Sequence, residues 1–299
     1  MKCLYRGETG KPVDDSLHRV HDTYAVDNLF LFVGARMHPE VEETIRLLQQ
    51  AEDREGLDPF GFRPDMVGKV LPFTQWLYRH WFRVEVAGME SIPAGRVLLI
   101  ANHSGQLPYD GAMIATAMLL ELRPPRMTRT MVEKWVATLP WVSTFFARCG
   151  QAIGTPANAR RLLKQGEAIL VFPEGSRGIS KPFEERYQLQ EFGLGFMRLA
   201  LETNTPIIPI GVVGAEEQLP SLMNIEFLAR LLKTPAVPLT PTLFVPLPVK
   251  YRVFFGEPMY FEGDFDDEDR IIRDKVERVT NAIEALLQRG LRERSGIFR

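Results

Sequence analysis

The stretch Val97-Leu98-Leu99-Ile100-Ala101-Asn102-His103 decides the fold that we expect for this chain. Five apolar residues follow one another without a charge, and a polar Asn-His pair comes directly after them. Such a short run is typical of a strand buried on both faces of a parallel sheet. A second run, Ala168-Ile169-Leu170-Val171, has the same character and leads into Phe172-Pro173-Glu174. Ligands of open sheets bind outside the carboxyl ends of the strands, so the polar residues after both runs are expected to meet at one edge.

Outward from these two runs, strand-like and helix-like segments alternate along the chain. The strand patterns cover residues 82–86, 96–101, 126–131, 167–172, 206–213 and 251–255. The helix patterns cover residues 39–50, 64–80, 110–122, 133–147, 156–165, 190–203 and 222–232, and a last helix ends near Gly290. The pattern at 64–80 contains Gly68 and Pro72, so a broken helix is expected there. Strands interleaved with helices require crossovers, and the sequence therefore predicts an α/β fold with a mainly parallel sheet flanked by helices.

Two segments stand apart from this alternation. Residues 1–62 are expected to form an N-terminal helical extension, and residues 63–299 the main domain. Within the main domain, residues 216–249 form an insertion in which a wide apolar helix pattern precedes a proline-rich strip. That strip has too many prolines for a central strand. The apolar face of the insertion is expected either to enter a lipid interface or to pack over the domain's own core.

Composition and charge restrict the class of protein. The chain has 299 residues, enough to bury a sizeable core, and its net charge of −2 argues against a dedicated nucleic-acid binder. Its two cysteines, Cys3 and Cys149, cannot supply a disulfide framework or a cysteine-based metal site, which indicates a reducing compartment. Apolar runs fall short of the roughly 18 residues of a membrane-spanning helix, and the first residues lack an apolar signal. We therefore expect a cytoplasmic protein.

His103 and Asp110 form the first candidate pair for chemistry. A neutral imidazole takes a proton from a hydroxyl when a carboxylate holds its other nitrogen and stabilises the imidazolium. Asp110 can equally serve as the cap of the helix that follows, which would leave His103 as an ordinary loop histidine. By itself this pair leaves both interpretations open.

The second candidate motif is Glu174-Gly175-Ser176-Arg177, after the second buried run. Arg177 offers a planar guanidinium suited to phosphate or carboxylate, and Gly175 permits close approach of the backbone. The alternative is a surface Glu–Arg turn, which is common and contributes little to stability. The glycine and serine between the charges favour a binding function.

In order and spacing, residues 102–110 and 173–177 resemble two signature blocks of the glycerolipid and lysophospholipid acyltransferase superfamily. Residues 205–213, a strand pattern that carries Pro209, resemble a further block. The resemblance spans residues 80–260 and implies a glycerol-phosphate acyltransferase-like fold. It implies that His103 is the general base and that Asp110 orients it. It also implies that Glu174, Gly175, Ser176 and Arg177 line the acceptor site and that Pro209 shapes its far wall.

The resemblance further implies a reaction. An acyl chain would move from an acyl-CoA or acyl carrier protein thioester to a hydroxyl of a glycerolipid or lysophospholipid, without a metal or a bound cofactor. The expected partners are these lipids and a membrane surface, not nucleic acid, with the protein peripheral at the inner face of the membrane. The alternatives are a thioester hydrolase with the same base, or a catalytically silent lipid-binding protein of the same fold.

Two departures from the family pattern bear on these expectations. Six residues separate His103 from Asp110, more than is usual for the block, so the loop must bulge if the side chains still meet. The second block, around residues 150–156, lacks the arginine expected to hold an acceptor phosphate. The first block also looks more like the monoacylglycerol/diacylglycerol acyltransferase-like branch. The missing arginine and the likeness of the first block to that branch favour a less charged acceptor than lysophosphatidic acid.

Overall fold

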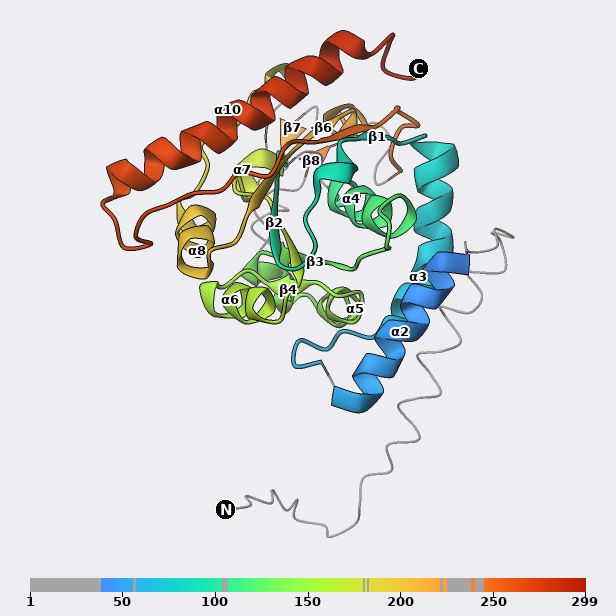
Figure 1. Cartoon of the computed structure of the whole chain (residues 1–299). Helices are drawn as coiled ribbons and strands as arrows, with labels where there is room; N and C mark the ends of the chain where they lie inside the picture. The colour runs from blue at the N-terminus through green and yellow to red at the C-terminus, as the bar shows by residue number, and fades with distance from the viewer. Residues whose placement is uncertain are drawn as a thin grey trace. The chain divides into compact units, whose positions relative to one another are not determined.

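The computed structural model describes residues 39–55, 58–103, 107–179, 181, 183–220, 223–224, 238–239 and 245–299. Within these ranges one sheet has seven strands in the order β1-β9-β6-β2-β5-β3-β4 (Figure 1). The strands are β1 (Glu85–Ala87), β2 (Val97–Ala101), β3 (Thr128–Val132), β4 (Ala152–Ile153), β5 (Ala168–Val171), β6 (Ile207–Val213) and β9 (Arg252–Phe255). β9 runs antiparallel to β6, and the other neighbouring pairs are parallel. The predicted mainly parallel α/β class is confirmed.

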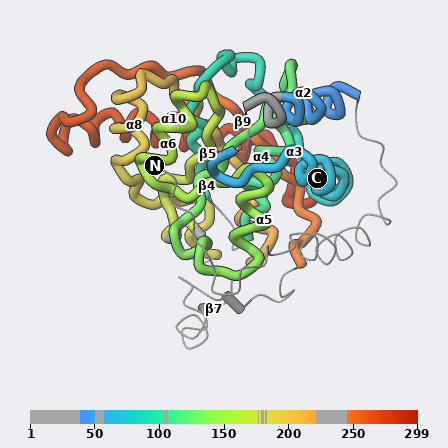
Figure 2. Tube along the Cα trace, turned by 90° about the horizontal axis from the view of Figure 1, so that it is seen from below, coloured from blue at the N-terminus to red at the C-terminus, as the bar shows by residue number. Residues whose placement is uncertain are grey.

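Helices cover both faces of the sheet, as Figures 1 and 2 show from two directions. Their bounds are α2 (Pro39–Glu55), α3 (Pro64–Trp76), α4 (Tyr109–Leu120), α5 (Val142–Arg148), α6 (Pro156–Lys164), α7 (Ser176–Ile179), α8 (Gly195–Thr203) and α10 (Asp269–Glu293). Alternate residues of β2 divide between the two faces. Leu99 and Ala101 pack in the cluster that contains α3 and α4, whereas Leu98 and Ile100 pack in the cluster that contains α6, α8 and α10. This alternation explains why β2 is apolar at every position.

The predicted break at Pro72 is wrong. Residues Pro64–Trp76 form one α-helix with Pro72 inside it, and a π-helical turn, Leu77–Trp81, continues it. A proline removes one intrahelical hydrogen bond, here the bond to the carbonyl four residues earlier. Burial of Val67 and Leu71 in the core holds the helix together despite that loss.

Other boundaries follow the local chemistry. Thr155 caps α6, because its hydroxyl accepts a hydrogen bond from the Asn158 N–H at 3.2 Å. Helix α8 begins at Gly195 and not at 190, since the Gln190 N–H is engaged elsewhere, as described below. The last helix extends three residues past Gly290, to Glu293.

Most of the insertion lies outside the described residues. Met223–Asn224 (β7) pairs antiparallel with Pro238–Leu239 (β8), so the helix expected from residue 222 is wrong at 223–224. Residues 225–237 are not described. Where the insertion returns to the domain, the Leu247 N–H donates to the Gln218 carbonyl at 2.7 Å. Its two ends are thereby held together.

Part of the expected N-terminal extension packs on the main domain. Residues 37–299 form one compact unit. Val41 and Ile45 of α2 lie in the same core cluster as Phe62 and Leu71. Residues 1–38 lie outside the described part of the chain.

Candidate active site

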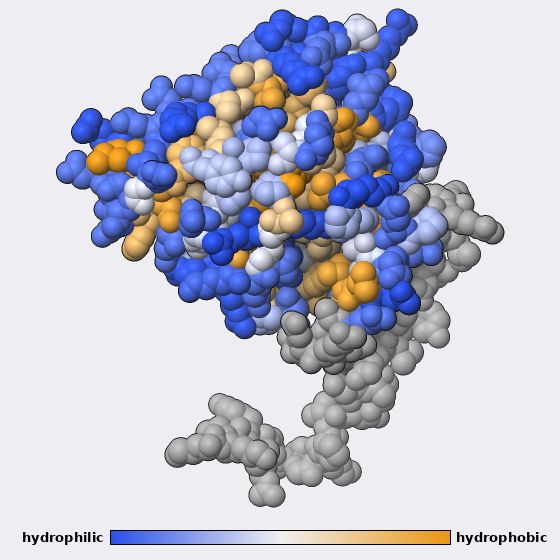
Figure 3. All heavy atoms as spheres, in the orientation of Figure 1, coloured by the Kyte–Doolittle hydropathy of each residue, from blue (hydrophilic) through white to orange (hydrophobic). Residues whose placement is uncertain are grey.

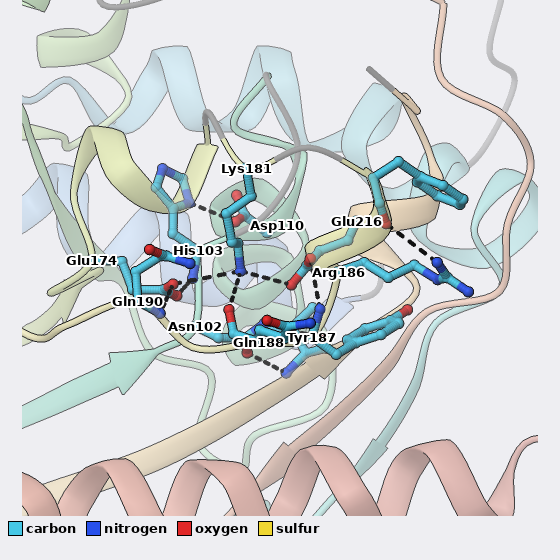
Figure 4. A network of polar contacts seen from close by, with 12 residues as sticks. Asn102, His103, Asp110, Glu174, Lys181, Arg186, Tyr187, Gln188, Gln190 and Glu216 are labelled. Atoms are coloured by element: carbon cyan, nitrogen blue, oxygen red, sulfur yellow. Dashed lines mark hydrogen bonds and ion pairs between the residues drawn. The ribbon is translucent and has the colours of Figure 1, made fainter. Parts of the chain in front are cut away.

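Three neighbouring parallel strands deliver charged residues to one edge of the sheet. His103 follows β2, Glu174 follows β5, and Glu133 follows β3, and these strands are adjacent in the order β2-β5-β3. Because carboxyl ends of parallel strands lie at the same edge, the side chains are brought together from distant parts of the sequence. Figure 4 shows His103, Asp110 and Glu174 close to one another in this region.

The His103 and Asp110 side chains meet. His103 Nδ1 lies 2.7 Å from Asp110 Oδ2, and the Asp110 side chain is fully buried in the first turn of α4. Pro108, not Asp110, occupies the N-cap position of α4, and it makes no side-chain cap bond. The longer spacing between the two residues therefore does not separate them. While Asp110 Oδ2 contacts the imidazole, its Oδ1 accepts a hydrogen bond from the Gly111 N–H at 2.7 Å in the first turn of α4.

The surroundings of His103 favour its protonated form. Burial opposes the charge, but the Asp110 carboxylate, together with Glu174 and Glu133, raises the pKa of His103. The imidazole stacks on the Phe172 ring with a centroid distance of 4.3 Å, and its side chain is 16% exposed. With Nδ1–H directed at Asp110, the neutral ring presents the Nε2 lone pair. That nitrogen is the one suited to accept a proton from a substrate.

The buried Glu174 carboxylate links three segments of the chain. Its Oε1 accepts a hydrogen bond from the His103 N–H at 2.8 Å, and its Oε2 accepts one from the Gln190 N–H at 2.9 Å. Lys181 Nζ lies 3.5 Å from Oε2. Both carboxylate oxygens are thus occupied within the protein. Glu174 therefore fixes the backbone of the candidate base. That it lines the acceptor site stays a prediction.

Lys181 joins this carboxylate to a second one. Its side chain is only 4% exposed, and Nζ also lies 3.2 Å from Glu216 Oε1 and donates to the Gln188 carbonyl at 3.0 Å. The other Glu216 oxygen accepts from the Tyr187 N–H at 2.8 Å (Figure 4). Burial raises the pKa of Glu216 against the attraction of Lys181. The network links Lys181 and residues 187–190 to Glu174, which binds the backbone of the candidate base.

Two further features fix the His103 backbone. The Asn102 amide pairs with Val212 in both directions, donating to its carbonyl at 3.2 Å and accepting from its N–H at 2.8 Å. Gly178 lies against the base, because a Cβ added there would stand 2.9 Å from His103 Cβ and 3.0 Å from Glu174 Cβ. A side chain at residue 178 would push the two loops apart.

The remaining predicted site residues are placed less closely together. Gly175 forms a turn with a φ of +57°, which favours glycine, and nothing is described of the Ser176 side chain. The Arg177 side chain is 56% exposed and donates to the Glu191 carbonyl at 2.8 Å. Pro209 lies within β6 opposite Ile100, and its ring faces Gly256 on the side of the sheet covered by α10. The structure does not bring Pro209 to the face that carries His103.

The sequence analysis missed Glu133, Lys181 and Gln190. Glu133 obeys the same rule as His103 and Glu174, since it follows the carboxyl end of a predicted strand, and applying the rule to that third strand would have found it. Lys181 and Gln190 lie in an irregular segment, where the sequence carries no periodic signal. Their contacts with Glu174 become visible only in three dimensions.

Two kinds of feature are absent from the described ranges. These ranges contain no cluster of three or more His, Cys, Asp or Glu side chains able to hold a metal ion. No described helix combines the length and apolar character needed to cross a bilayer.

Comparisons with known proteins agree with this geometry. Residues 83–213 match the family model described as Acyltransferase. Uncharacterized proteins of Mycobacterium leprae and Mycobacterium tuberculosis are each 38% identical, over 81% and 84% of this chain and 70% and 74% of their own length. A Gallus gallus protein, named DGAT1/2-independent enzyme synthesizing storage lipids, is 26% identical over 70% of this chain and 60% of its own.

A solved structure shares the fold. The crystal structure of the 1-acyl-sn-glycerophosphate (LPA) acyltransferase PlsC from Thermotoga maritima aligns with a TM-score of 0.52 at 16% identity. The alignment covers 94% of this chain and 92% of that one.

Proposed function

Because this chain belongs to the glycerolipid acyltransferase superfamily, we propose that it transfers a fatty acyl chain from an acyl-CoA or acyl carrier protein thioester to a hydroxyl group of a glycerolipid or lysophospholipid. The observation that carries the proposal is the 2.7 Å contact between His103 Nδ1 and Asp110 Oδ2. It leaves His103 Nε2 as a base at the edge of the sheet where ligands of such folds bind.

The reaction follows from this arrangement. Neutral His103 accepts the proton of the acceptor hydroxyl at Nε2 while the hydroxyl oxygen bonds to the thioester carbonyl carbon. Asp110 stabilises the imidazolium that forms, as a buried carboxylate does in other histidine-based sites. The tetrahedral oxyanion then collapses, the C–S bond breaks, and the leaving thiolate takes the proton from the imidazolium. The products are an ester and a free thiol, and His103 returns to its neutral form.

Product analysis tests the proposal. Purified protein is supplied with acyl-CoA and, separately, acyl carrier protein thioesters, together with monoacylglycerol, diacylglycerol and lysophosphatidate in vesicles. Thiol release and lipid products are measured by absorbance and mass spectrometry. We expect new ester in the same amount as the thiol released, and only when an acceptor is present. Free fatty acid released without an acceptor would instead identify a hydrolase, and intact thioester throughout would identify a silent lipid-binding protein.

We also propose that the protein works while bound peripherally to the inner face of a membrane. Hydrophobic patches interrupt the hydrophilic surface seen in Figure 3. Trp141 is 84% exposed, and Val142 and Phe145 of α5 are 39% and 42% exposed. Large apolar side chains that lie exposed together favour a lipid or protein contact, and tryptophan suits the membrane interface.

Trp141→Ala is expected to weaken binding to anionic lipid vesicles about tenfold, since insertion of a large apolar side chain contributes roughly 1.5–3 kcal/mol. Flotation of the full chain with vesicles measures this. Phe265→Ala is the matched control, because Phe265 is an exposed aromatic residue in the acidic segment that precedes α10. Equal flotation of the Trp141→Ala variant and the unmodified protein would contradict a role for α5 in membrane binding.

A further inference from the structure

Glu133 stands at the rim of the candidate site with a charge that no cation in the described part of the chain neutralises. It is the first residue after β3 and is exposed. Its Oε2 accepts a hydrogen bond from Trp135 Nε1 at 3.1 Å, which holds the carboxylate in place. Within the described ranges no Lys or Arg lies in ion-pair distance of it.

The Glu133 carboxylate faces the turn that follows β5. Its Oε1 lies 3.1 Å from the position that a Cβ on Gly175 would take. Gly175 directly follows Glu174, which binds the His103 backbone. The Glu133 charge also contributes to the raised pKa of His103, so its field reaches the base.

The other charged side chains around His103 make ion pairs or hydrogen bonds within the protein. Asp110 contacts the His103 ring, and Glu174 shares Lys181 with Glu216. Arg177 contacts Glu191. Among the described residues, Glu133 is therefore an exposed carboxylate beside this site with no Lys or Arg in ion-pair distance, whereas Asp110, Glu174 and Glu216 are buried against their partners.

Building on the proposed function, we propose that Glu133 makes this site select acceptors that carry no charge beside the reacting hydroxyl, such as monoacylglycerol, over acceptors that carry a phosphate there. A phosphate brought beside a fixed carboxylate is repelled by Coulomb's law, and the repulsion grows as water is excluded from the site. The same carboxylate can accept a hydrogen bond from the non-reacting hydroxyl of an uncharged glycerolipid.

Internal competition tests this selection. Monoacylglycerol and lysophosphatidate with the same acyl chain are mixed in one vesicle preparation, and the ratio of their kcat/KM values is read from the two products by mass spectrometry. We expect the unmodified protein to prefer monoacylglycerol. Glu133→Gln should move the ratio toward lysophosphatidate by about tenfold, the effect of roughly 1.4 kcal/mol, and Glu133→Lys should move it further. Any effect of these variants on His103 acts on both acceptors and cancels in the ratio.

Glu257→Gln and Glu257→Lys are the matched controls. Glu257 is exposed and follows β9, which runs antiparallel to β6, so it lies at the opposite edge of the sheet. The control ratios should equal that of the unmodified protein. A ratio unchanged in both Glu133 variants, or a preference of the unmodified protein for lysophosphatidate, would overturn the inference while the proposed function stands. If neither of these two acceptors nor diacylglycerol yields an ester, the proposed function is overturned, and this inference with it.

Discussion

Replacing His103 by alanine is expected to lower kcat for acyl transfer by about a thousandfold, the middle of the range for loss of a general base. The variant lacks the group that takes the hydroxyl proton, while Asp110, Glu174 and the rest of the site remain. Among the described residues, the His103 ring stacks on Phe172 and contacts the Asp110 carboxylate. The fold is therefore expected to survive, as judged by circular dichroism and thermal unfolding.

His80→Ala is the matched control for this substitution. His80 is an exposed histidine in the π-helical turn Leu77–Trp81. Its replacement should leave turnover unchanged. His103→Asn is a second variant, which keeps a polar group near Asp110. It tests the role of His103 even if the His103→Ala variant fails to fold. Turnover near that of the unmodified protein in a folded His103 variant would exclude this residue as the base.

Glu174→Gln is expected to reduce both stability and turnover. Glutamine keeps one acceptor oxygen, but its NH₂ group would then face either the His103 N–H or the Gln190 N–H, both of which are donors. Lys181 also loses one of its two carboxylates while its side chain remains 4% exposed. Breaking a buried pair of this kind costs about 3 kcal/mol in the free energy of unfolding. Turnover falls as well, because the His103 backbone is released.

Urea denaturation measures the loss, and two further variants identify its cause. Glu185→Gln, at an exposed position in the same segment, should leave the free energy of unfolding unchanged. The double variant Glu174→Gln with Lys181→Met should lose less stability than the sum of the two single variants, since their side chains are in contact. Additive effects, or a Glu174→Gln variant as stable as Glu185→Gln, would contradict the role of this network.

The sequence predicts the central sheet and the contact between His103 and Asp110 because both depend on local patterns. The apolar run at 97–101 and the run at 168–171 form buried strands next to each other, as expected. His103 and Asp110 are seven positions apart, at the end of one strand and in the first turn of the next helix, so a single loop brings them together. The bulge that the six-residue spacing predicts stays a prediction, because residues 104–106 of that loop lie outside the described part of the chain.

The roles of Glu174 and Pro209 could not be read from the sequence because they depend on packing between distant segments. A glutamate at the end of a strand predicts a charge at the sheet edge, but not that both its oxygens are occupied by His103, Gln190 and Lys181. A proline in a strand pattern gives no indication of the face on which its ring lies. The register of β6 against β2 decides this and places Pro209 on the face covered by α10.

The proposed mechanism requires a neutral His103 that Asp110 holds in place. The pH dependence of kcat/KM for acyl transfer tests this requirement. The protonated imidazole is inactive as a base, so a raised pKa delays activity to higher pH. We predict that kcat/KM rises through one ionisation above 6.5, the ordinary value for histidine. In Asp110→Asn this ionisation should move down in pH, and the plateau should fall by less than in His103→Ala. A profile that stays flat through the histidine range, or the same midpoint in Asp110→Asn, would contradict the account.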